Sequence, residues 1–138
     1  MTPAPPLRIA LVEDNQDLCE SWVELLELEG HQVKTFLDGA SLLQDAAAVH
    51  WCDALVTDYY LPDVNGIELI MQARQLRGDL PAILLSGVRD RSVIDLLNKL
   101  PHSLYLPKPA APDDLFAALG SIAATQALRP VPVVGPGT

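Results

Sequence analysis

Five side chains of this chain could together hold a divalent cation and a phosphate group. Glu13, Asp14, Asp58, Ser86 and Lys108 each follow a short apolar run of the sequence. Carboxylate oxygens are ligands that Mg²⁺ prefers, and a carboxylate beside a cation can attack phosphorus. A serine hydroxyl can donate to a phosphate oxygen, and a lysine ammonium can pair with one. If the fold brings these residues together, they can carry out phosphoryl transfer to a carboxylate.

Three carboxylates that share one pocket repel one another. At ~5 Å and an effective dielectric constant of ~20, each pair costs about 3 kcal/mol. Mg²⁺ suits this pocket better than Ca²⁺, because one or two carboxylates, waters and a phosphate complete its octahedron. Lys108 supplies a second positive charge. We therefore expect Mg²⁺ as the cofactor.

Alternating strand and helix patterns must position these side chains. Apolar runs predict strands at residues 7–12, 54–57 and 82–85, and two more strands are predicted at 32–36, before a turn, and at 103–106. Helical spacing predicts helices after Asn15, over 41–49, after Asn65, over 91–100 and over 112–126. This pattern predicts an α/β fold of (βα)5 type, a doubly wound five-stranded parallel sheet with helices on both faces. In the strand order 2-1-3-4-5, Glu13, Asp14 and Asp58 meet at the carboxyl ends of two neighbouring strands.

Composition excludes several other classes of protein. Nine Lys and Arg against eighteen Asp and Glu give a net charge of −9, which opposes nucleic-acid binding. Hydrophobic residues at 49% oppose a disordered chain, and no apolar run approaches the ~20 residues of a membrane span. The N-terminus lacks the pattern of a secretory signal. Cys19 and Cys52 fit two reduced thiols, so we expect a cytoplasmic protein without membrane contact.

The length of 138 residues suits one domain. Proline-rich segments at both ends cannot enter a helix or a central strand. We expect an extended or disordered N-terminus over residues 1–6, one domain over 7–127, and a Pro/Gly-rich tail or linker over 128–138.

Four motifs in sequence order resemble a known family. They are VEDN at 12–15, TDYYLP at 57–62 followed by Gly66, LSG at 85–87 and YLPKP at 105–109. With their spacing, they resemble the receiver domain of two-component response regulators, whose fold is flavodoxin-like or CheY-like. The resemblance covers residues 7–127.

The resemblance implies a phosphoacceptor and a metal site. It implies that Asp58 accepts a phosphoryl group from a phosphohistidine on a histidine kinase or histidine phosphotransfer domain. It implies Mg²⁺ bound by Asp14, Asp58 and the backbone carbonyl of Tyr60, with Glu13 reaching the ion directly or through water. Such a domain is a signalling module that catalyses its own phosphorylation and dephosphorylation, not a turnover enzyme.

The resemblance also implies a switch and an output surface. Ser86 would move toward the phosphoryl group as Tyr105 turns inward, and Lys108 would help to hold that group. The output surface would comprise residues 91–100, 103–106 and 113–125, and the charged run 89–91 could contact a partner. An output domain or partner protein is implied but not identified. The resemblance leaves open a stand-alone regulator, the receiver of a transcription factor and the receiver of a hybrid histidine kinase. Residues 58–62 and 81–86 are somewhat more similar to hybrid-kinase receivers.

Two alternatives share much of this chemistry. A phosphatase of the haloacid dehalogenase type would place a second Asp two residues after its nucleophile, where this chain has Tyr60. A degenerate interaction domain would not need the acidic pair, Asp58, Ser86 and Lys108 together. The three histidines (His31, His50 and His102) are expected to be solvated loop residues.

Overall fold

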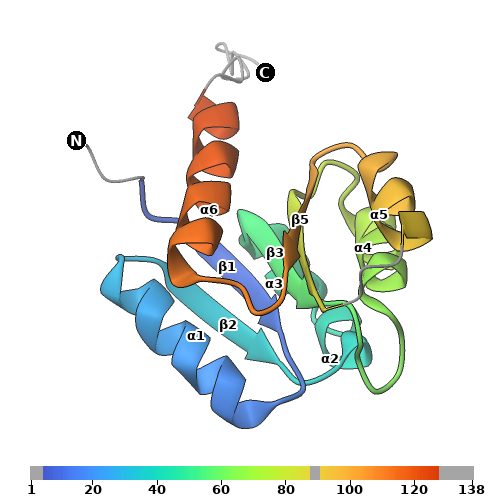
Figure 1. The fold of residues 1–138 in the computed structure, drawn as a ribbon, viewed down its shortest axis with the longest axis horizontal. Coiled ribbons are helices and arrows are strands. Elements are labelled where there is room, and N and C mark those ends of the chain that lie inside the picture. The colour runs from blue at the N-terminus through green and yellow to red at the C-terminus, as the bar shows by residue number, and fades with distance from the viewer. Residues whose placement is uncertain (1–4, 88–90, 128–138) are drawn as a thin grey trace, which may run out of the picture.

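The computed structural model describes residues 5–87 and 91–127, in which five parallel strands form one sheet (Figure 1). The strands are β1 (Arg8–Val12), β2 (Gln32–Phe36), β3 (Ala54–Asp58), β4 (Ala82–Ser86) and β5 (Ser103–Pro107). The helices are α1 (Gln16–Leu28), α2 (Gly39–Leu43), α3 (Ala46–Trp51), α4 (Gly66–Leu76), α5 (Arg91–Asn98) and α6 (Pro112–Ala127). The order β2-β1-β3-β4-β5 confirms the predicted fold class and strand order.

Alternate residues of each central strand face opposite layers of helices, which explains why these strands are apolar throughout. Ile9 and Leu11 of β1 belong to the core under α1 and α6, where Trp22 packs. Ala10 and Val12 of the same strand belong to the core under the other helices. The sheet is therefore the middle layer of three.

Asparagine side chains start the two helices that follow the acidic strand ends, as the sequence predicted. The Oδ1 atom of Asn15 accepts the backbone N–H of Leu18 at 3.0 Å, at the start of α1. The Oδ1 atom of Asn65 accepts the N–H of Glu68 at 2.9 Å, at the start of α4. Each cap satisfies one of the backbone donors that a helix leaves unpaired at its first turn.

The prediction of one continuous helix over residues 41–49 was wrong. Two short helices, α2 and α3, occupy this segment, with Gln44 and Asp45 between them. The carboxylate of Asp45 accepts the N–H of Ala48 at 3.0 Å and so caps α3. Aspartate competes for backbone donors in this way, and a capping residue inside an alanine-rich run divides it.

His31 is buried, so its prediction as a solvated loop residue was wrong. Its Nδ1 atom accepts the backbone N–H of Leu7 at 2.9 Å, and only 7% of the residue is exposed. Burial lowers the pKa of this imidazole. The neutral ring accepts this hydrogen bond and so connects Leu7, just before β1, to His31, just before β2. His50 and His102 are exposed, as predicted, but His50 lies in α3 and not in a loop.

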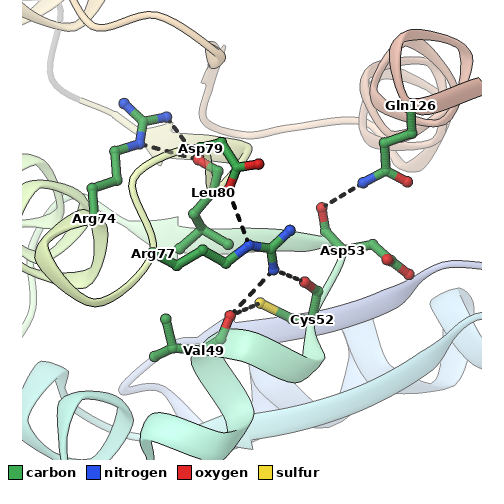
Figure 2. Close-up of polar contacts among 8 residues, drawn as sticks. All are labelled: Val49, Cys52, Asp53, Arg74, Arg77, Asp79, Leu80 and Gln126. Carbon is green, nitrogen blue, oxygen red and sulfur yellow. Dashed lines mark hydrogen bonds and ion pairs between the residues drawn. The ribbon is translucent and has the colours of Figure 1, made fainter. Parts of the chain in front are cut away.

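Arg74 of α4 and Arg77, directly after α4, donate hydrogen bonds at the end of the sheet where the strands begin (Figure 2). Both Nε and Nη2 of Arg74 donate to the carbonyl of Leu80, at 3.1 and 2.9 Å, just before β4. Arg77 donates to the carbonyls of Val49 and Cys52 at the end of α3. These bonds fix the amino ends of the strands, opposite the end where the acidic residues lie.

No helix among the described residues is long and apolar enough to span a bilayer. The predicted flanking residues 1–4 and 128–138, and Arg89 and Asp90 of the predicted contact, lie outside the described residues.

Candidate functional site

Three carboxylates meet at the carboxyl ends of β1 and β3. Glu13 and Asp14 directly follow β1, and Asp58 is the last residue of β3. Val12 pairs with Thr57 in the parallel register, so the two strands end side by side. One carboxylate oxygen from each acid lies within 4.8 Å of the others. The sheet therefore gathers the acidic residues that the sequence placed at three positions of the chain.

Lys108 reaches this cluster from the far side of β4. Its Nζ atom lies 2.7 Å from Oδ1 of Asp58 and 3.5 Å from Oε1 of Glu13. Its backbone N–H donates to the carbonyl of Ser86 at 2.9 Å, which anchors the start of the loop after β5. The following peptide bond, Lys108–Pro109, is cis. Burial lowers the pKa of the ammonium, but its contacts with Asp58 and Glu13 outweigh that effect and raise the pKa, so Lys108 is charged.

Glu13 is a buried acid with a raised pKa. It is 2% exposed, and burial together with the nearby charge of Asp58 raises its pKa from 4.5 to about 7. The N–H of Asn15, which donates to Oε2 at 3.2 Å, and the ammonium of Lys108 oppose this shift. Glu13 therefore retains its proton to a higher pH than an exposed glutamate does.

This donor set could bind a metal. Three clustered carboxylates offer only oxygen, the ligand type of Mg²⁺ and Ca²⁺, and contain none of the sulfur or imidazole groups that favour zinc. Asp14 is exposed, whereas Glu13 and Asp58 are buried, so the cluster opens to solvent on the side of Asp14. An ion could enter there without a change of fold.

Ser86 and Tyr105 lie on the two strands beyond Asp58. Ser86 is the last residue of β4, is 1% exposed, and follows Leu85, which pairs with Asp58. The hydroxyl of Tyr105, on β5, donates to the backbone carbonyl of Ser86 at 3.3 Å. Ser86 is thus part of β4, the strand next to Asp58, and Tyr105 is hydrogen-bonded to that strand.

Tyr60 stands in the loop from β3 to α4. Its ring is 67% exposed and meets the ring of Tyr59 edge-on, with 5.0 Å between the centroids. Its backbone forms an isolated bridge with Asn65, and the N–H of Gly66 donates to the carbonyl of Tyr59 at 2.7 Å. The main chain after Asp58 is thus folded back on itself.

Sequence reasoning missed Asp63 and the packing role of Gly66, and both residues shape this loop. Asp63 accepts the N–H groups of Gly39 and Ala40 at 3.0 and 2.8 Å, and these bonds, the one from Gly39 first, lower its pKa. The sequence singled out Gly66 at a helix start and in a motif but not for its packing, and a Cβ there would collide with the backbone oxygen of Asp58. Asp63 gave no local signal, because its partners lie over twenty positions away in the sequence.

Comparisons with known proteins agree with this geometry. The sequence model of the response regulator receiver domain matches residues 9–120. Response regulator MprA of Mycobacterium sp. (strain KMS) is 34% identical over 119 residues, which are 85% of this chain and 50% of that protein. The chain therefore spans about half the length of the curated relatives it matches.

Solved structures show the same fold. A response regulator from Chloroflexus aurantiacus J-10-fl, described as putative, has a TM-score of 0.77 and 28% identity over 87% of this chain and 99% of that one. The response regulator DrrB, described as a Thermotoga maritima OmpR/PhoB homolog, has a TM-score of 0.76 and 27% identity. That match covers 88% of this chain and 54% of DrrB.

Proposed function

This chain belongs to the response regulator receiver domain family of two-component signalling systems, and on that premise we propose that Asp58 is its phosphoacceptor. The donor is a phosphohistidine on a histidine kinase or histidine phosphotransfer domain. A carboxylate oxygen of Asp58 forms a bond to phosphorus while the bond from phosphorus to the histidine nitrogen breaks. The ammonium that lies 2.7 Å from Oδ1 of Asp58, beside two more carboxylates, is the observation that carries this proposal.

Lys108 and Ser86 hold the incoming group in this proposal. The ammonium of Lys108 already faces Asp58 and can pair with a phosphoryl oxygen once the carboxylate has become an acyl phosphate. Ser86, at the end of the adjacent strand, can donate its hydroxyl to another oxygen. Charge stabilisation of this kind lowers the barrier to phosphoryl transfer.

Mg²⁺ is the proposed cofactor. Asp14, Asp58 and the backbone carbonyl of Tyr60 would hold it, with Glu13 bound directly or through water. The ion would neutralise the carboxylates and the oxygens of the donor phosphate. The chemistry of the donor set, three clustered carboxylates with one lysine, supports this assignment.

Ser86 and Tyr105 form the proposed switch. Movement of Ser86 toward the phosphoryl group would alter the contact between its carbonyl and the Tyr105 hydroxyl, and so bias two arrangements of β5 and its neighbours. We propose that residues 7–127 are the receiver domain, that 1–6 and 128–138 flank it, and that an output domain or partner protein reads the switch in the cytoplasm. The longer relatives support an output domain.

Intact mass after incubation with acetyl phosphate and MgCl₂ tests the phosphoacceptor. We expect the wild type to gain one phosphoryl group, and Asp58→Asn to gain none. Asp95→Asn, which removes an exposed carboxylate of α5, is the matched control and should be labelled like the wild type. Labelling of Asp58→Asn equal to the wild type would refute the assignment. Repeated release of phosphate from a phosphomonoester would favour a phosphatase instead.

A further inference from the structure

A groove of about 650 Å³ runs between α1 and β2, and none of the residues of the proposed phosphoacceptor site lines it. Its floor is apolar and includes Cys19, Val23 and Val33, with half-exposed Leu37 at one end. Apolar surface of this kind gains free energy when a partner covers it.

The rim of the groove is acidic. Glu20, Glu24 and Glu27 lie four and three positions apart on one face of α1, and all three line the groove. None of the three forms an ion pair with the part of the chain that the structure describes, and no described lysine or arginine lines the groove. Three uncompensated carboxylates above an apolar floor complement a cationic partner.

β2 offers an open sheet edge along the same groove. It is the outermost strand on its side, and the N–H of Gln32 and the carbonyl of Phe36 both point to the β1 side. Successive residues of a strand point their backbone groups to opposite sides, so Val33 and Thr35 present theirs to the open edge. An extended segment can pair with such an edge through its main chain.

We propose that the groove binds an extended basic segment of another protein, which adds to the edge of β2 and pairs with the three glutamates of α1. Alternate side chains of a strand lie ~6.6 Å apart, and residues four apart on a helix rise ~6 Å, so lysines at alternate positions match the acidic rim. The aliphatic stems of those lysines cover the apolar floor while their ammonium groups reach the carboxylates.

A second copy of this chain is the less suitable occupant. Each copy carries a net charge of −9, and pairing of two β2 edges would bring two acidic rims together. The edge also carries Lys34, a charged residue of the kind that protects edge strands from self-association. The same net charge would attract a basic segment and speed its association.

Binding of a fluorescein-labelled peptide of four Lys-Val repeats, followed by fluorescence anisotropy, tests this proposal. We expect the triple variant Glu20→Gln, Glu24→Gln, Glu27→Gln to bind this peptide about tenfold more weakly than the wild type, since each exposed ion pair contributes modestly. A control with the same change in net charge (Glu68→Gln, Asp113→Asn, Asp114→Asn) should weaken binding much less, because it reduces only the general charge attraction. Equal weakening of both triple variants would refute the groove and leave only general charge attraction.

A second peptide tests the strand pairing. The lysine N–H groups would face β2 in an antiparallel pair and the valine N–H groups in a parallel pair. N-methylation of every backbone nitrogen of the peptide removes the donors for either direction and leaves the side-chain charges unchanged, so we expect binding to weaken several-fold. Equal affinity of the methylated and unmethylated peptides would refute addition to the β2 edge. Both measurements use unphosphorylated protein, so their outcome is independent of the phosphoacceptor assignment.

Discussion

Removal of the buried charge at Glu13 should stabilise the metal-free protein. In Glu13→Gln the amide keeps an oxygen that can accept the N–H of Asn15, so the loop after β1 retains its hydrogen bond. What disappears is a carboxylate that is 2% exposed and lies within 4.8 Å of an oxygen of Asp58. The variant isolates the cost of holding three carboxylates together.

The pKa of Glu13 sets the size of this effect. A rise from 4.5 to about 7 means that the folded state holds a proton which the unfolded state has released. Stability contributed by this group is therefore present below pH 4.5 and is lost as the pH rises through 7. Linkage gives a cost of roughly 1 kcal/mol at pH 5 and about 3 kcal/mol at pH 8. Glu13→Gln should recover most of that cost at pH 8 and little at pH 5.

Urea unfolding in EDTA at the two pH values measures the difference. Glu68→Gln, an exposed acid at the start of α4, is the control and should change the free energy of unfolding by less than about 0.5 kcal/mol. A gain for Glu13→Gln that is equal at pH 5 and pH 8, or no gain at pH 8, would refute the electrostatic reasoning. Excess Mg²⁺ in place of EDTA should stabilise the wild type more than the variant, because binding to the folded state adds stability.

Three further substitutions test contacts that hold the fold together, one beside the site and two at the opposite end of the sheet. Gly66→Ala should lower the free energy of unfolding by about 2 kcal/mol or more, because the new Cβ meets the backbone oxygen of Asp58, the proposed phosphoacceptor. Gly78→Ala is the control, because its Cβ meets nothing closer than 3.9 Å, and it should not destabilise the protein. Urea unfolding measures both. Arg77→Met should cost about 1–3 kcal/mol in the same assay, because it removes the guanidinium that donates to the carbonyls of Val49 and Cys52 at the end of α3. An unchanged midpoint would contradict that role. Burial lowers the pKa of His31, so its contribution to the free energy of unfolding is complete above pH ~6.5 and is lost as the pH falls below that value. His31→Gln should make the free energy of unfolding less dependent on pH in this acid range. His50→Gln, at an exposed site, should leave that dependence unchanged.

Local features of the sequence predicted most of the fold. Apolar runs marked the strands because central parallel strands are buried on both faces, and Asn15 and Asn65 marked helix starts because their side chains satisfy nearby backbone donors. The predictions of one helix over residues 41–49 and of a solvated His31 were wrong. Asp45 divides the first by capping a second helix, and His31 is buried by a bond to residue 7, which lies far from it in the sequence.

The sequence by itself determined which chemical groups stand at the ends of the strands, because a buried strand must end where charge begins. Only the tertiary structure decided their distances and charges. Parallel pairing of β1 with β3 brings Glu13 and Asp58 together, and the chain beyond β5 brings Lys108 closer to Asp58 than to Glu13. The raised pKa of Glu13 follows from burial and a neighbouring charge, and both depend on contacts between residues distant in the chain.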